Sequence, residues 1–86
     1  MKIKGYLTYR DLIGEQILDL DEHGELTLRE LLMDISRRSG SQEILEQDGR
    51  VIVLVNGRSL SQLPDELDTI LHQDDQVDIF PPIAGG

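Results

Sequence analysis

Hydrophobic and polar positions alternate over residues 2–10. Ile3, Leu7 and Tyr9 are separated mainly by lysine and threonine side chains. This period of two predicts a strand with one face turned inward. Residues 76–80 show the same alternation, so we expect a second strand of this kind near the end of the chain.

Two turns are predicted to join neighbouring strands. Residues 11–14 begin with aspartate and end with glycine, so they can turn the chain and make residues 15–20 the hairpin partner of the first strand. The stronger turn signal is Asn56-Gly57, because both residues tolerate a positive φ. It follows the β-branched run 51–55, which we expect to be a well-buried strand, and it leads into a short strand over residues 58–60.

The clearest local pattern predicts one helix. Thr27 is expected to be its N-cap, with Glu30 completing a capping box. Arginines stand where the last turn should be, and Gly40 is a suitable terminator. One apolar stripe along this helix, which we expect to cover the sheet, consists of Leu28, Leu31, Leu32 and Ile35. Residues 63–71 are expected to form a capping loop, with a helical turn opened by Pro64.

The last strand places its aromatic residue outside. Its alternation buries Val77 and Ile79 and turns Asp78 and Phe80 to the opposite face. If the first and last strands are neighbours, Tyr6 shares that face with Phe80. Single exposed apolar residues are normal, but an aromatic pair favours a docking patch for another protein.

Length and composition limit the class of protein. The 86 residues suit one domain, and a 38% hydrophobic share with only 3% aromatics predicts a core of Leu, Ile and Val. No apolar run approaches the roughly 18 residues that span a membrane. The first residues lack the features of a signal peptide, so we expect a cytoplasmic protein.

Few reactive groups are available. The absence of cysteine excludes disulfides, thiolate zinc sites and a cysteine nucleophile. His23 and His72 lack ligand spacing, so we expect no bound metal. There is no recognisable acid/base pair and no phosphate-binding loop, so we expect the isolated chain not to be an enzyme. A net charge of −9 argues against binding to nucleic acids or anionic membranes. The scattered acids serve solubility, steering towards a basic partner, or both.

The last six residues carry the strongest functional signal. Pro81 and Pro82 favour an extended backbone that leaves the domain. Gly85 and Gly86 have no side chain, so a narrow slot in another protein can admit them. The segment spans at most about 20 Å. The alternative is an ordinary frayed end, but a strand that runs straight into Pro-Pro and stops at Gly-Gly favours a functional tail.

The order of strands and helix, together with the Gly-Gly end, resembles the ubiquitin-like β-grasp. More closely, the chain is similar to the MoaD/ThiS family of sulfur-carrier proteins. Residues 9–14 resemble the family's V-R-E-L-V-G stretch, residues 55–57 its V-N-G, and residues 77–86 its F-P-P-V-x-G-G ending. The Phe-Pro-Pro step points to the small subunit of molybdopterin synthase. One departure is the sequence of residues 73–76, where the family often has D-G-D-E; this questions the local turn.

The resemblance implies an α+β fold with a mixed four- to five-stranded sheet packed on one main helix. The domain would cover residues 1–80 and the tail residues 81–86. A ubiquitin-activating-type adenylyltransferase would adenylate Gly86 with ATP and Mg²⁺, and a sulfur donor would convert it to a thiocarboxylate. A molybdopterin synthase large subunit would then accept the tail. Gly85 and Gly86 would be the threaded residues, and the partner-binding residues would be Tyr6, Leu60, Phe80, Pro81, Pro82 and Ile83.

Two other functions remain open at this point. β-Grasp relatives such as the small archaeal modifier proteins use the same ending to form isopeptide bonds with lysines. For self-linkage this chain offers only Lys2 and Lys4. The third hypothesis is a plain interaction module with an incidental Gly-Gly end. The sequence does not distinguish sulfur transfer from conjugation, or molybdenum from tungsten.

Overall fold

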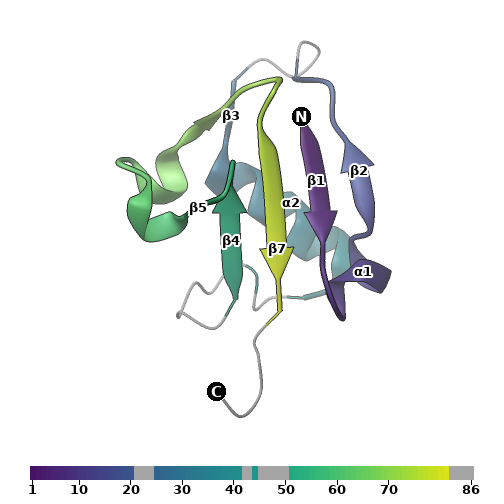
Figure 1. Cartoon of the computed structure of the whole chain (residues 1–86). Helices are drawn as coiled ribbons and strands as arrows, with labels where there is room; N and C mark the ends of the chain where they lie inside the picture. The colour runs from purple at the N-terminus through teal and green to yellow at the C-terminus, as the bar shows by residue number, and fades with distance from the viewer. Residues whose placement is uncertain (21–24, 42–43, 45–50, 82–86) are drawn as a thin grey trace.

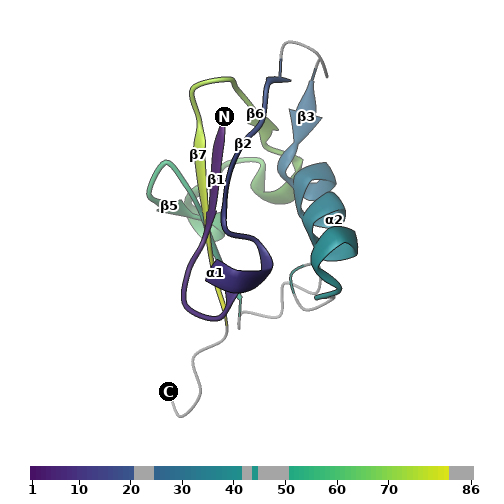
Figure 2. The same ribbon diagram turned by 90° about the vertical axis from the view of Figure 1, so that its right-hand side faces the viewer.

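One mixed sheet forms the centre of the molecule. The computed structural model describes residues 1–20, 25–41, 44 and 51–81. The five strands lie in the order β2-β1-β7-β4-β5, and a helix, α2, covers one face (Figures 1 and 2). Their bounds are β1 Lys2–Gly5, β2 Glu15–Ile17, β4 Ile52–Val55, β5 Arg58–Ser59, β7 Gln76–Phe80 and α2 Leu28–Ser39. β1 and β7 run parallel, whereas the other neighbours are antiparallel, so the expected fold class is confirmed.

The helix forms where its capping signals predict. The Thr27 hydroxyl accepts a hydrogen bond from the Glu30 amide at 3.2 Å, and the Glu30 carboxylate accepts one from the Thr27 amide at 3.3 Å. Gly40 ends the helix with a φ of 74°, which a glycine adopts without strain. The predicted stripe of Leu28, Leu31, Leu32 and Ile35 is buried.

Among the described residues, the core is aliphatic apart from Tyr9 and Met1. Ile3, Val77 and Ile79 of the central strands face α2 and are almost completely buried. They meet the stripe of the helix, as the alternation predicted. No helix in the described part of the chain is long and apolar enough to cross a membrane.

The first strand is shorter than predicted. It ends at Gly5, and a short helix, α1 (Tyr9–Leu12), follows. Tyr9 is buried as expected, but Leu7 is 60% exposed, which contradicts the predicted inward face. The strand ends here because Tyr9 and Ile13 pack directly against Gly5. A Cβ on Gly5 would collide with the Tyr9 carbonyl oxygen and would lie 2.9 Å from the Cβ of Ile13. The chain therefore folds back over Gly5 instead of continuing the strand.

The hairpin at Asn56-Gly57 is confirmed. These residues have φ values of 53° and 80°, and Val55 pairs with Arg58 across the turn. The preceding strand is less buried than predicted, because Ile52 is 39% exposed. Since α2 covers only one face of the sheet, β4 alternates between core and surface like its neighbours.

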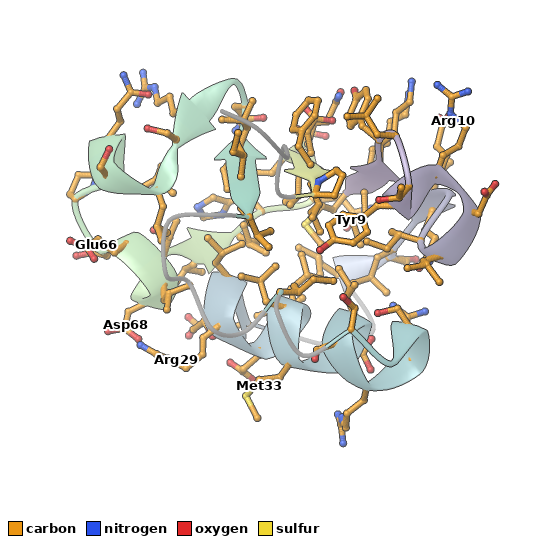
Figure 3. The ribbon with its side chains drawn as sticks, turned by 90° about the horizontal axis from the view of Figure 1, so that it is seen from below. Tyr9, Arg10, Arg29, Met33, Glu66 and Asp68 are labelled. Carbon is orange, nitrogen blue, oxygen red and sulfur yellow. The ribbon has the colours of Figure 1, made fainter. Side chains whose placement is uncertain are left out.

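The loop predicted over residues 63–71 contains more structure than expected. After β5 the chain forms two short 3₁₀ turns, η2 (Leu60–Gln62) and η3 (Glu66–Asp68). It then forms β6 (Ile70–Leu71), which pairs with β3 (Leu26–Thr27). Neither of these two-residue strands was predicted. Figure 3 shows Asp68 of η3 beside Arg29 of α2, and their ion pair of 3.3 Å ties the loop to the helix.

Candidate functional site

Tyr6 and Phe80 form an aromatic stack on the outer face of the sheet, away from α2. Tyr6 directly follows β1, and its amide donates a hydrogen bond of 3.0 Å to the carbonyl oxygen of Ile79. The ring centroids lie 4.3 Å apart with planes only 10° from parallel. The prediction that the two residues share a face is therefore confirmed. Aromatic rings are favoured at protein interfaces because they bury large areas with few rotatable bonds.

Polar neighbours hold the Tyr6 ring in place. Its hydroxyl donates a hydrogen bond of 3.1 Å to Asp78 Oδ1, and Nε2 of the Gln76 side chain donates one of 3.0 Å to the same oxygen. The Lys4 ammonium group lies 5.0 Å from the ring centroid, within the range of a cation–π interaction. Burial, with help from the hydrogen bond to Asp78, raises the pKa of Tyr6 above its ordinary value. The hydroxyl therefore remains a donor at neutral pH.

Ile52 extends the stack across the sheet. It is the register partner of Phe80, so the two side chains lie side by side on the outer face. Ile52 also lines a shallow hollow together with Leu60, one of the predicted partner-binding residues. We call Tyr6, Phe80, Ile52 and Leu60 the apolar strip. Ile52 was missed because a continuous β-branched run does not show which residues face outward.

An ion pair borders the apolar strip. Lys2 Nζ lies 2.9 Å from Glu15 Oε1, and both side chains are about half exposed. The hydrogen bond to Glu15 raises the pKa of Lys2, and the same bond lowers the pKa of Glu15. The outer face thus joins an apolar centre to a charged rim, which is the usual organisation of a protein interface.

Pro81 anchors the root of the tail. It is buried directly after β7 ends at Phe80. The other predicted tail residues, Pro82, Ile83, Gly85 and Gly86, lie outside the described residues, so their roles stay predictions. His23 also lies outside this part of the chain. Among the residues that the structure describes, no group of three or more His, Asp or Glu side chains is arranged to hold a metal ion.

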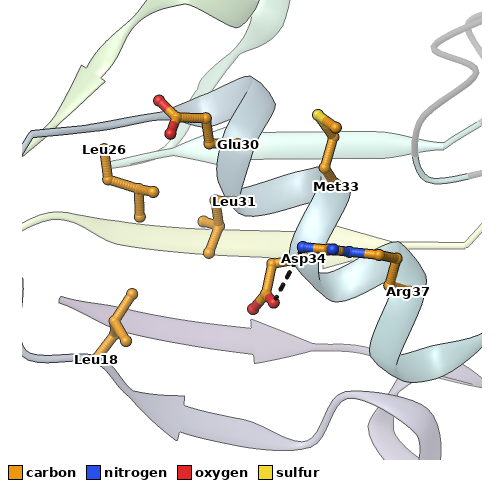
Figure 4. A pocket seen from close by; sticks show the side chains of 7 residues that line it. All are labelled: Leu18, Leu26, Glu30, Leu31, Met33, Asp34 and Arg37. Atoms are coloured by element: carbon orange, nitrogen blue, oxygen red, sulfur yellow. Dashed lines mark ion pairs between the residues drawn. The ribbon is translucent and has the colours of Figure 1, made fainter. Parts of the chain in front are cut away.

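A second hollow lies on the helix side of the molecule. Figure 4 shows Leu18, Leu26 and Leu31 facing one another across it. On its rim, Asp34 forms an ion pair of 3.9 Å with Arg37. The core and the sheet separate this hollow from the apolar strip. Both carboxylates that line it are already engaged, because Glu30 accepts hydrogen bonds from Thr27 and Asp34 forms ion pairs with arginines of α2.

Comparison with known proteins gives the family. The ThiS family model matches residues 7–86. The chain belongs to the ThiS family. Small archaeal modifier protein 3 of Haloferax volcanii is 30% identical over 91 residues, covering this whole chain and 98% of that protein.

Solved structures agree with this membership. A Pyrococcus furiosus protein assigned as molybdopterin converting factor subunit 1 has a TM-score of 0.68 and 27% identity, covering 95% of each chain. Small archaeal modifier protein 1 of Methanosarcina acetivorans has a TM-score of 0.70 over 99% of this chain and 94% of its own. At 21% identity, the latter supports the fold alone. This ThiS-family chain is therefore a small ubiquitin-like carrier of the class that works with activating enzymes and partner subunits.

Proposed function

We propose that this chain is a sulfur carrier for molybdopterin biosynthesis, with the Gly86 carboxylate as its reactive group. The apolar strip carries the proposal, because three of its residues, Tyr6, Phe80 and Ile52, lie beside the point where β7 passes into the Pro-Pro-Ile-Ala-Gly-Gly segment. A partner that binds the strip receives the tail at the same time. The similarity to the Pyrococcus furiosus protein supports the molybdopterin role.

The chemistry needs an activating partner because a carboxylate is a poor electrophile. A ubiquitin-activating-type adenylyltransferase supplies ATP and Mg²⁺. The carboxylate oxygen attacks the α-phosphorus of ATP, and pyrophosphate leaves. A hydrosulfide equivalent then attacks the carbonyl carbon and loses a proton, and AMP departs with the C–O bonding electrons. The product is a thiocarboxylate, whose sulfur passes to a pterin precursor in a complex with a molybdopterin synthase large subunit.

The chain itself contributes binding and presentation. In this proposal Tyr6, Phe80 and Leu60 contact the partner, and the side-chain-free Gly85 and Gly86 enter its active site. Pro81 holds the root of the tail against the domain. None of these residues has to move a proton.

Intact mass spectrometry tests the first steps. The protein is incubated with its cognate adenylyltransferase, ATP and a sulfide source, and we expect the mass gain of one O-to-S exchange. A variant lacking Gly86 is the matched control and should gain nothing. Absence of the gain in the wild-type protein would rule out sulfur carriage. Addition of the large subunit and the pterin precursor should then yield molybdopterin, which tests the pathway.

Protein modification is the second candidate function. It is supported by the 30% identity to small archaeal modifier protein 3 over the whole chain. The adenylation step is the same, but a lysine amine then attacks the carbonyl carbon and displaces AMP. An epitope-tagged chain should give larger adducts on denaturing gels. Replacing Lys2 and Lys4 by arginine removes self-linkage and keeps the charge, so adducts that persist are conjugates with other proteins.

A further inference from the structure

Leu7 has a backbone conformation that leucine disfavours. Its φ is +54°. Leu7 is the first central residue of a turn that is closed by a hydrogen bond of 2.9 Å from the Tyr9 amide to the Tyr6 carbonyl oxygen. Such positions are usually occupied by Gly, Asn or Asp, because a Cβ crowds the backbone when φ is positive. The branched leucine side chain gives no local hydrogen bond in return.

Folding does not explain the choice of leucine here. The side chain is 60% exposed, so it buries little apolar surface within its own domain. The turn is fixed from both sides, by the bond from the Tyr6 amide to Ile79 and by the buried Tyr9. Glycine or asparagine would satisfy the same backbone with less strain. Strained conformations of this kind are found preferentially at functional sites.

The position of Leu7 connects it to the apolar strip and to the tail. It directly follows Tyr6, which stacks on Phe80. Gly5 pairs with Ile79, so the turn lies at the same end of the central strands as the passage from β7 into Pro81 (Figure 1). The proposed function places Gly86 in a partner's active site, and residues 81–86 span at most about 20 Å. A partner surface within that reach of Pro81 also lies within reach of Leu7.

We propose that Leu7 is a binding residue for the activating adenylyltransferase, whose surface offers an apolar recess beside the entrance for the tail. This inference rests on the proposed function and adds a partner contact to it. The activating enzyme is the occupant because adenylation precedes both sulfur transfer and conjugation. An apolar recess fits because the neighbouring contacts, Tyr6 and Phe80, are aromatic.

The test separates binding from stability. Leu7→Asn and Leu7→Gly relieve the backbone strain and remove the apolar contact, whereas Leu7→Met retains an apolar side chain. Met33→Gln is the matched control, because Met33 is an exposed apolar residue on the solvent side of α2 (Figure 3). Pyrophosphate release by the cognate adenylyltransferase is measured against carrier concentration, and stability is measured by urea unfolding.

We expect Leu7→Asn and Leu7→Gly to raise KM for the carrier about ten-fold, which corresponds to loss of one partly buried aliphatic contact. The kcat should stay close to that of the wild type, and the urea midpoint should be unchanged or higher. Leu7→Met and Met33→Gln should retain the wild-type KM. A wild-type KM in Leu7→Asn would overturn this inference alone.

Two other outcomes also count against it. A urea midpoint that falls together with the rise in KM would assign Leu7 a structural role and overturn the binding role. Absence of pyrophosphate release with the wild-type carrier would overturn the proposed function, and this inference with it.

Discussion

The Tyr6 hydroxyl donates a hydrogen bond of 3.1 Å to Asp78, and the Tyr6 ring stacks on Phe80. These two contacts can be separated by mutation. Tyr6→Phe keeps the stack and removes only the hydrogen bond, so it should lower the free energy of unfolding slightly and leave adenylation nearly unchanged. Tyr6→Ala removes both contacts and should lower kcat/KM for adenylation about ten-fold or more. Equal activity of the two variants would contradict a binding role for the ring.

Gly5 should be among the residues least tolerant of substitution. A methyl group there would collide with the Tyr9 carbonyl oxygen and with Ile13 Cβ. Gly5→Ala should therefore lower the free energy of unfolding by about 2 kcal/mol or more. Gly57→Ala is the control. Its new Cβ would have no atom within 4 Å, so the only cost is the backbone strain of alanine at a φ of 80°. Urea unfolding of both variants checks this difference, and an equal or smaller loss for Gly5→Ala would argue against the close approach.

Asn56 has two roles in its turn. Besides its positive φ, its side-chain Nδ2 donates a hydrogen bond of 2.9 Å to Asp75 Oδ1, and its side-chain Oδ1 accepts one of 3.0 Å from the backbone amide of Gln76. Asn56→Gly keeps the backbone conformation and loses the hydrogen bonds, so it should cost about 1 kcal/mol. Asn56→Ala loses the same hydrogen bonds and also places an alanine at a positive φ, so it should lower the free energy of unfolding by about 2 kcal/mol. Equal losses in thermal or urea unfolding would show that the positive φ is unimportant.

The Lys2–Glu15 pair should affect stability at low pH. The pKa of Glu15 is lowered from its ordinary value of 4.5 by the hydrogen bond to Lys2. A carboxyl group with a lowered pKa stabilises the fold above its unfolded pKa, and the stabilisation is lost as pH falls through the folded value. The effect is small because both side chains are about half exposed. Glu15→Gln should therefore flatten the decline of the urea midpoint below about pH 4.5.

The Lys2–Glu15 pair should also affect stability at high pH. The pKa of Lys2 is raised by the hydrogen bond to Glu15, so the contribution of the pair is complete below 10.5 and is lost as pH rises through the folded value. Lys2→Met should remove this loss. The double variant of Lys2 and Glu15 should show neither effect, and a decline at low pH identical to that of the wild type would exclude the pair as its source.

Local signals were sufficient for part of the fold. Thr27 and Glu30 satisfy each other's backbone amides within three residues, and Asn56 and Gly57 both tolerate the positive φ of a tight turn. The sequence alone therefore predicts the helix start and the hairpin. The turn after β6 also forms without glycine: the Asp75 amide bonds the His72 carbonyl oxygen at 3.0 Å, and Asp75 accepts from the His72 amide. The departure from the family's D-G-D-E is therefore accommodated.

Other features depend on distant contacts. The alternation of residues 2–10 continues past Gly5, so only the approach of Tyr9 reveals where the strand ends. Leu26 pairs with Leu71, and neither two-residue strand has a periodic signal of its own. At the site, Tyr6 and Phe80 were predicted together because both adjoin strand patterns. Ile52 and Leu7 could not be predicted, since register and a positive φ are properties of the folded chain.

β7 is the middle strand of the sheet, bonded to β1 on one side and β4 on the other. Tension on the end of the chain beyond Phe80 is therefore distributed between two neighbours, and it acts across rows of hydrogen bonds that must slide together instead of opening one by one. The domain is consequently well suited to remain folded when its C-terminal end is pulled.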